Sequence, residues 1–123
     1  MRNNLVRLSI SLIILCLVFS MSVFAIEYPE KDIRTICPWG EGGGTDAITR
    51  MITKIAEKPI PVSIYVENIE GGVSGTGVFE VMKARPDGYT IGTMTYDSII
   101  TVPRKELVPG YDLDKLAMIC RLT

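Results

Sequence analysis

Apolar and polar positions repeat with two different periods along this chain, and the change of period predicts its elements. Short runs rich in β-branched and aromatic residues indicate strands. Longer segments whose apolar residues recur three and four positions apart predict helices. The expected strands are 33–37, 62–67, 89–94 and 116–122. The expected helices are 47–58, 75–85 and a short one over 95–100, with an irregular stretch from 103 to 112.

The order of these elements predicts an α/β fold. Strands that alternate with helices form a parallel sheet with helices packed on it, and right-handed crossovers bring the carboxyl ends of the strands to one edge. Two glycine-rich loops, 38–46 and 68–77, follow the first two strands, and a further loop follows Met94. Ligands bind at this edge in open α/β sheets, so we expect the loops to converge on one site.

The first helix has a clear apolar face. Its members are Ala47, Ile48, Met51, Ile52, Ile55 and Ala56. Thr45 or Asp46 is expected to cap its N-terminus, and Pro59 to end it. Strand, glycine-rich turn and helix N-terminus together suit an anion, because the first N–H groups of a helix have no intrahelical partner and glycine lets the backbone approach a ligand.

The N-terminal segment reads as a signal peptide for export. Arg2 and Arg7 precede an uncharged apolar run over 8–24, and Val23-Phe24-Ala25 fits a small-x-small cleavage site. We therefore expect residues 1–25 to be removed after Ala25, and residues 26–123 to form the periplasmic part. The alternative is an uncleaved membrane anchor, although the apolar run is short for a span. The final expected strand has no closing helix, which indicates the N-terminal part of a longer protein.

Composition narrows the candidate chemistry. The chain has 13 basic and 14 acidic residues, so nothing indicates a nucleic-acid partner. It has no histidine, which removes the usual general base and the commonest metal ligand. We expect no catalytic residues, no metal and no cofactor. Cys37 and Cys120 can pair in an exported protein, or each can be a small buried strand residue.

The glycine loops allow three interpretations, and the first two are a dinucleotide site and an enzyme site. Residues 42–47 match the dinucleotide pattern G-x-G-x-x-A, with Glu67 about 20 residues on. Asp46 would repel a pyrophosphate at that loop. The expected signal peptide also exports the chain to a compartment where free nicotinamide cofactor is scarce. An exported α/β enzyme acting on a small anion is the alternative function, but the acidic residues show no recognisable pairing. The third interpretation is a binding protein whose helix N-termini hold a small anion.

Four features carry a resemblance to a known family, and they cover nearly all of the exported part. They are Tyr28-Pro29 with Ile33-Arg34; Pro38-Trp39-Gly40-Glu41-Gly42-Gly43-Gly44-Thr45-Asp46; Val66-Glu67-Asn68 with Gly71-Gly72; and Lys83-Ala84-Arg85-Pro86-Asp87-Gly88-Tyr89-Thr90-Ile91. Their order and spacing resemble the extracytoplasmic receptors of the tripartite tricarboxylate transporter family, the Bug-type solute-binding proteins.

The resemblance implies a periplasmic-binding-protein fold of type II, of which this chain would be the βαβαβ first half of lobe one. It implies a non-enzymatic receptor that captures a small carboxylate and delivers it to membrane subunits of the transporter. The loops matching the family's ligand loops, with the end of the third strand, give the expected site. Its residues are Trp39, Gly42, Gly43, Gly44, Thr45, Asp46, Gly72, Val73, Ser74, Thr93 and Tyr96.

Several of these residues also have ordinary structural roles. Asp46 can accept backbone N–H groups, and Ser74 can cap its helix. Asn68 is expected to fix the loop rather than to touch ligand. Glu41 departs from the family pattern, and we expect it to point outward.

Overall fold

The computed structural model describes residues 28–121. The elements are β1 (Ile33–Cys37), α2 (Gly44–Ala56), β2 (Ile64–Asn68), α3 (Gly75–Lys83), β3 (Thr90–Gly92), α4 (Tyr96–Arg104) and a 3-10 turn, η1 (Leu113–Lys115). The expected signal peptide with its cleavage site, and the last two residues of the expected fourth strand, lie outside the described residues.

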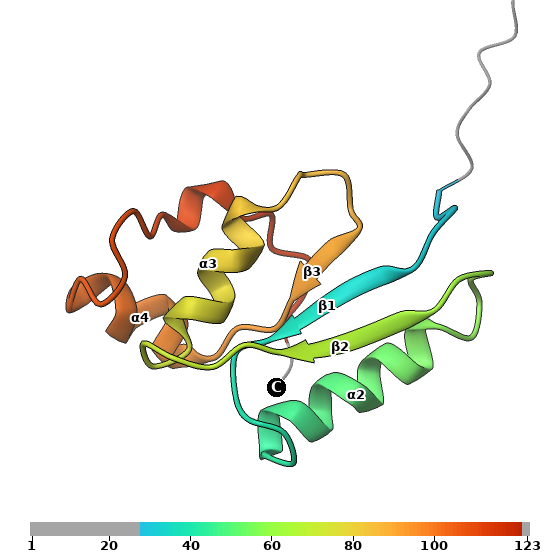
Figure 1. Cartoon of the computed structure of the whole chain (residues 1–123), viewed down its shortest axis with the longest axis horizontal. Helices are drawn as coiled ribbons and strands as arrows, with labels where there is room; N and C mark the ends of the chain where they lie inside the picture. The colour runs from blue at the N-terminus through green and yellow to red at the C-terminus, as the bar shows by residue number, and fades with distance from the viewer. Residues whose placement is uncertain (1–27, 122–123) are drawn as a thin grey trace, which may run out of the picture.

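The three strands form one parallel sheet in the order β2-β1-β3. Thr35 at its centre pairs with Val66 of β2 and Ile91 of β3. α2 covers one face, against β2 and β1, and α3 covers the other, against β1 and β3 (Figure 1). The expected parallel α/β sheet is therefore confirmed, and all three strands end at the same edge.

The apolar core is small and lies between the sheet and α3. Its buried members are Ile33, Ile36, Cys37, Val78 and Val102. α3 approaches the loops after β1 and β2 very closely: a Cβ on Gly77 would lie 2.6 Å from the carbonyl oxygen of Ile69, after β2, and 2.8 Å from the Cα of Pro38, after β1. Only glycine fits at that contact, because any larger residue would push the helix away from the loops.

The side of α2 that packs on the sheet is not its apolar face. Asp46, Thr49 and Thr53 are buried against the strands, whereas Ile48 and Ile55 are about half exposed. The expectation of a Thr45 or Asp46 cap is also wrong. The helix begins a turn earlier than predicted, with Gly43 as N-cap and no side-chain cap bond.

The C-terminal part differs most from the prediction. α4 runs to Arg104 and contains Pro103, so the region expected to be irregular from 103 is helical at its start. The strand expected over 116–122 is wrong, since residues 116–121 form no helix or strand. An apolar run becomes a strand only when its backbone finds a partner. Among the described residues none pairs with it, and Ile119 is 82% exposed.

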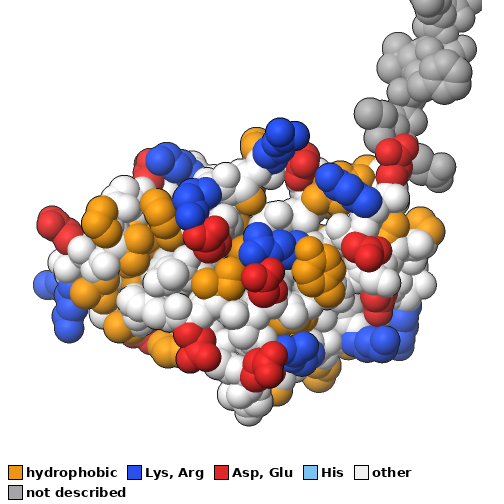
Figure 2. All heavy atoms as spheres, in the orientation of Figure 1, with side chains coloured by type: hydrophobic (Ala, Val, Ile, Leu, Met, Phe, Trp, Pro, Cys, Tyr) orange, Lys and Arg blue, Asp and Glu red, His pale blue; other side chains and the backbone are white. Residues whose placement is uncertain are grey.

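The surface carries charges of both signs side by side. Figure 2 shows lysine and arginine side chains next to acidic ones on the face turned to the viewer. Arg34 pairs with Glu67 at 2.7 Å, and Lys83 pairs with Glu80. The two cysteines of the described residues are free, Cys37 buried in β1 and Cys120 exposed. Within residues 28–121, no helix has the length and hydrophobicity needed to cross a membrane.

Candidate functional site

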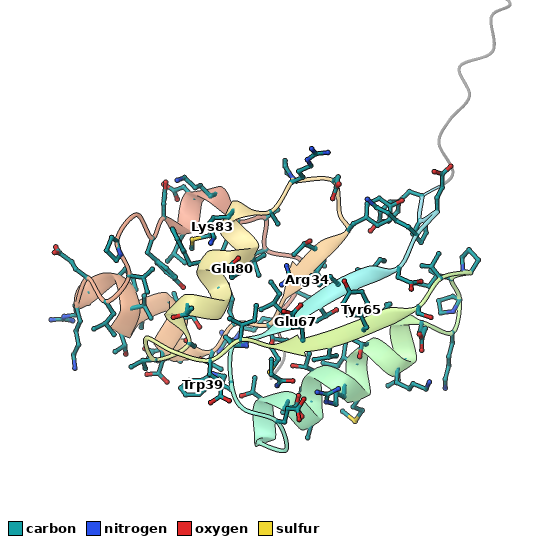
Figure 3. All side chains as sticks on the ribbon, in the orientation of Figure 1. Arg34, Trp39, Tyr65, Glu67, Glu80 and Lys83 are labelled. Atoms are coloured by element: carbon teal, nitrogen blue, oxygen red, sulfur yellow. The ribbon has the colours of Figure 1, made fainter. Side chains whose placement is uncertain are left out.

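The loops that follow β1, β2 and β3 are joined by hydrogen bonds at the carboxyl edge of the sheet. Trp39, labelled in Figure 3, lies where they meet. Its indole Nε1 donates to Thr95 Oγ1 at 3.2 Å, in the loop after β3. Its carbonyl oxygen accepts from Asn68 Nδ2 at 2.7 Å, at the end of β2. One residue therefore holds the first loop to both neighbouring loops.

Asp46 forms a second junction, beneath the start of α2. Its carboxylate accepts the Gly42 N–H at 3.0 Å, Arg50 Nε at 3.0 Å and Asn68 Nδ2 at 2.8 Å. Asn68 Oδ1 also accepts from Arg50 Nη2 at 2.8 Å. Asn68 thus holds the first loop, although through distant partners rather than through the local backbone that was expected.

These bonds also set the electrostatics of the first loop. Hydrogen bonds from Arg50, then Asn68, then the Gly42 N–H lower the pKa of Asp46 to about 2. The hydrogen bond between Arg50 and Asp46 also raises the pKa of Arg50. Asp46 is therefore ionised at neutral pH, and the adjacent guanidinium offsets its charge.

The first turn of α2 presents backbone donors that have no intrahelical acceptor. The earliest intrahelical bond runs from the Ala47 N–H to the Gly43 carbonyl at 2.9 Å, which leaves the N–H groups of residues 44–46 without one. Gly42, with φ of +77°, turns the chain just before this point. Gly43 and Gly44 are exposed, so the positive end of the helix dipole faces solvent.

The loop after β2 has a different geometry from the first. Four successive residues have positive φ: Gly71 (123°), Gly72 (53°), Val73 (53°) and Ser74 (72°). Two first-turn donors of α3 are satisfied by this loop itself, since Gly75 N–H bonds the Gly72 carbonyl at 3.0 Å and Thr76 N–H bonds the Gly71 carbonyl at 3.2 Å. The second loop therefore has fewer free donors in its helix turn than the first.

The third loop supplies Thr93 and leads into α4. The Thr93 N–H extends the ladder to the Ile36 carbonyl at 3.0 Å, and its Oγ1 lies 3.1 Å from Thr49 Oγ1 of α2. Tyr96 begins α4, and its side chain is 76% exposed. α4 thus starts at the same edge as the other two helices.

The expected site residues fall into three groups by burial. Gly42, Gly43, Gly44, Gly72, Val73 and Tyr96 are exposed; Trp39, Thr45 and Thr93 are half-buried; Asp46 and Ser74 are buried. In this structure the two buried side chains bond to protein groups.

Sequence reasoning missed Arg50, Thr95 and Ser98. Arg50 had a usable signal, because an acid and a base four residues apart on a helix lie side by side. Thr95 and Ser98 form a capping box at the start of α4, but serine in place of glutamate makes the pattern weak in the sequence.

A surface hollow of about 600 Å³ lies beside the loops, along the outer edge of β2. It is lined by Glu41, Tyr65, Val66, Glu67, Asn68 and Glu70. Three glutamates disfavour an anion there, although Arg34 pairs with Glu67 on the neighbouring strand (Figure 3). Glu41 points outward as expected, with its carboxylate 3.7 Å from Arg50 Nη2. The described residues contain no cluster of three or more potential metal ligands.

Known proteins resemble the chain in sequence. It is 28% identical over 98 residues to the UPF0065 protein in the TAR-I ttuE-ttuC' intergenic region of Agrobacterium vitis, covering 76% of this chain and 28% of that protein. It is 30% identical over 69 residues to Protein BugT of Bordetella pertussis, covering 56% of this chain and 21% of that protein. Models of protein families gave no match.

Solved structures of known proteins resemble the chain in both fold and sequence. A TctC solute binding protein from Polaromonas, solved with no ligand, has a TM-score of 0.61 and 30% identity, over 67% of this chain and 28% of that one. The periplasmic binding protein BugD has a TM-score of 0.51 and 32% identity, over 53% and 22%. Rpa4515 of R. palustris, solved with adipate, has a TM-score of 0.52 and 26% identity, over 54% and 22%.

The fold and these neighbours define the class as periplasmic binding proteins. Within that class the chain belongs with the Bug and TctC proteins, the receptor family of tripartite tricarboxylate transporters, as the sequence motifs predicted. It spans between about a fifth and 28% of the length of the relatives described here.

Proposed function

We propose that this chain is part of an exported solute-binding receptor that captures a small carboxylate for a tripartite transporter. One observation carries the proposal: the N–H groups of residues 44–46, which have no intrahelical acceptor, lie at the carboxyl edge of the sheet, next to the loops after β2 and β3. A carboxylate suits such donors, because the helix dipole favours negative charge at that end.

The charge pattern around the first turn is compatible with an anion. Asp46 is the acid nearest these donors in the chain, and Arg50 offsets its charge at 3.0 Å. Glu41 is exposed and lies on the side of the hollow along β2. Both carboxylates therefore repel an anionic ligand at the first turn of α2 less strongly than an unpaired carboxylate beside it would.

The relatives support a binding role over an enzymatic one. Two structural neighbours, the TctC protein and BugD, are binding proteins, and a third, Rpa4515, was solved with adipate, a dicarboxylate. We infer that this chain also binds without transforming its ligand, that it works in the periplasm after cleavage at Ala25, and that transporter subunits in the membrane receive the ligand. Trp39, Gly42, Gly43, Gly44 and Thr45 form the wall of the site that this chain supplies, with Gly72, Val73 and Ser74 beside them.

A thermal-shift screen of the complete natural protein tests the proposal. Adipate, succinate and citrate are compared with the uncharged diamide of adipate, which has the same chain length. We expect at least one acid to raise the melting temperature while the diamide does not, because ligands that bind only the folded state stabilise it. Equal shifts with acid and diamide, or no shift with any acid, would refute the carboxylate site.

A further inference from the structure

The turn of residues 71–74 is held in an unusual backbone conformation. Val73 and Ser74 have φ of 53° and 72°, a region that residues with a Cβ adopt rarely and that β-branched residues avoid. Such conformations persist only where surrounding structure holds them. Val73 is exposed, so its side chain contributes little to holding the turn.

Ser74 provides the contact that holds this turn. Its side chain is buried, and its Oγ lies 2.6 Å from the Oγ of Ser98 on α4, which is also buried. Packing confirms the closeness of the two segments, since a Cβ on Gly75 would lie 2.9 Å from Val102 of α4. The turn after β2 is therefore anchored on α4.

Ser98 also contacts the loop after β3. Its Oγ accepts the Thr95 N–H at 3.2 Å, and Thr95 Oγ1 in turn accepts the indole N–H of Trp39 at 3.2 Å. The Ser98 carbonyl accepts the Tyr111 hydroxyl at 2.9 Å, and burial raises the pKa of that hydroxyl to about 12. One buried serine thus bonds directly to the loops that follow β2 and β3, and through Thr95 it is linked to Trp39 in the loop that follows β1.

We propose that Ser98 is a positioning residue for the ligand site: it holds the turn at Ser74 and the loop at Thr95 in one arrangement, and through Thr95 it fixes Trp39. The part of this proposal that concerns affinity rests on the proposed function. The part that concerns Trp39 does not, because it describes coupling between groups of the free protein.

Trp39 offers a direct reporter, since it is the only tryptophan in the chain. Its indole N–H gives one proton resonance, which lies downfield while the group is hydrogen-bonded. Ser98→Ala in the complete natural protein should shift this resonance upfield and weaken adipate binding about tenfold, the effect of losing roughly one well-formed hydrogen bond. Ile33→Val, a core change at the opposite end of β1, is the control for stability loss. It should change neither the indole resonance nor the affinity for adipate.

An unchanged indole resonance in Ser98→Ala would overturn the coupling. A shifted resonance with adipate affinity equal to that of Ile33→Val would overturn the positioning role. If Ser98→Ala does not fold, Ser98→Cys, which keeps the side chain nearly the same size but replaces its oxygen with a weak acceptor, is judged by the same two results. If the unsubstituted protein binds neither adipate nor citrate while the resonance shifts, the proposed function fails and the coupling of Ser98 to Trp39 stands.

Discussion

The amide Nδ2 of Asn68 lies 2.8 Å from Oδ1 of Asp46, joining the end of β2 to the first turn of α2. The same amide donates to the Trp39 carbonyl at 2.7 Å. Strand end, helix start and loop are therefore fixed by one side chain. The first-turn N–H donors of α2 owe their position at the sheet edge to this junction.

Asn68→Ala should destabilise the fold and loosen the first loop. The substitution leaves the Trp39 carbonyl without its Asn68 donor and removes one of the two side-chain donors to Asp46 Oδ1, the other being Arg50 Nε. An unsatisfied buried group costs about 1–3 kcal/mol. We expect a loss of this size in the free energy of unfolding, measured by urea denaturation. Lys54→Ala is the control: it breaks an exposed pair with Glu57 at 3.4 Å and should cost no more than about 1 kcal/mol. Equal losses in the two variants would contradict the role given to Asn68.

Acid should weaken the protein through Asp46 in a defined range of pH. The folded-state pKa of this carboxyl is about 2, below its ordinary value of 3.8. Its ionised form therefore adds stability that is fully present above about pH 4 and is lost as the pH falls through about 2. We expect the stability difference between the unsubstituted protein and Asp46→Asn to shrink across this range.

Urea denaturation at several pH values measures that difference. Glu57 and Glu67 also have lowered pKa values, from a backbone hydrogen bond to Ile64 and from Arg34 respectively. Comparison with Asp46→Asn removes their contribution, because both proteins contain them. A difference that stays constant down to pH 2 would show that Asp46 is not paired as the structure has it.

Thr35→Val should stabilise the protein. Among the described side chains, Thr35 Oγ1 is a buried polar atom without a hydrogen-bond partner. Valine has nearly the same shape, so the change removes the cost of burying an unpaired hydroxyl, about 1 kcal/mol or somewhat more. Thr49→Val is the matched control, because Thr49 Oγ1 bonds the Thr45 carbonyl at 2.7 Å and its loss should destabilise. Thermal unfolding of both variants checks the sign, and a destabilised Thr35→Val would contradict the account.

Gly77→Ala should separate α3 from the loops after β1 and β2. The new Cβ would lie 2.6 Å from the Ile69 carbonyl oxygen, and overpacking of this kind costs about 1–3 kcal/mol. Gly44→Ala is the control, since a Cβ there meets nothing within 4 Å and φ is not positive. Circular dichroism melts should show a clear loss for Gly77→Ala and none for Gly44→Ala. A neutral Gly77→Ala would mean that the contact is looser than described.

The sequence predicted those parts of the fold that depend on local pattern. The strand at Ile33–Cys37 and the strand–glycine loop–helix order were correct, because period and turn residues are local properties. The apolar run over 116–122 has strand composition, but pairing depends on a neighbour that local pattern does not reveal. The side of α2 that packs on the sheet was also not predictable from the sequence. Thr49 and Thr53 are buried because they lie on the side of the helix that the sheet covers.

The candidate site was predicted at the level of loops rather than of contacts. Gly42, Gly43 and Gly44 were singled out because glycine before a helix is a local signal. The bonds that join the loops involve partners far apart in sequence, such as Trp39 with Thr95 and Ser74 with Ser98. Ser98 looks like an ordinary helix serine in the sequence, and only the arrangement of three loops reveals its contacts.

Amide chemical shifts of the complete natural protein, followed during an adipate titration, test the central claim most directly. We predict that the N–H resonances of Gly44, Thr45 and Asp46 shift most, because these donors have no intrahelical acceptor. The diamide of adipate should leave them in place. Shifts confined to the hollow around Tyr65 and Glu67, or equal shifts with acid and diamide, would contradict a carboxylate site at the start of α2.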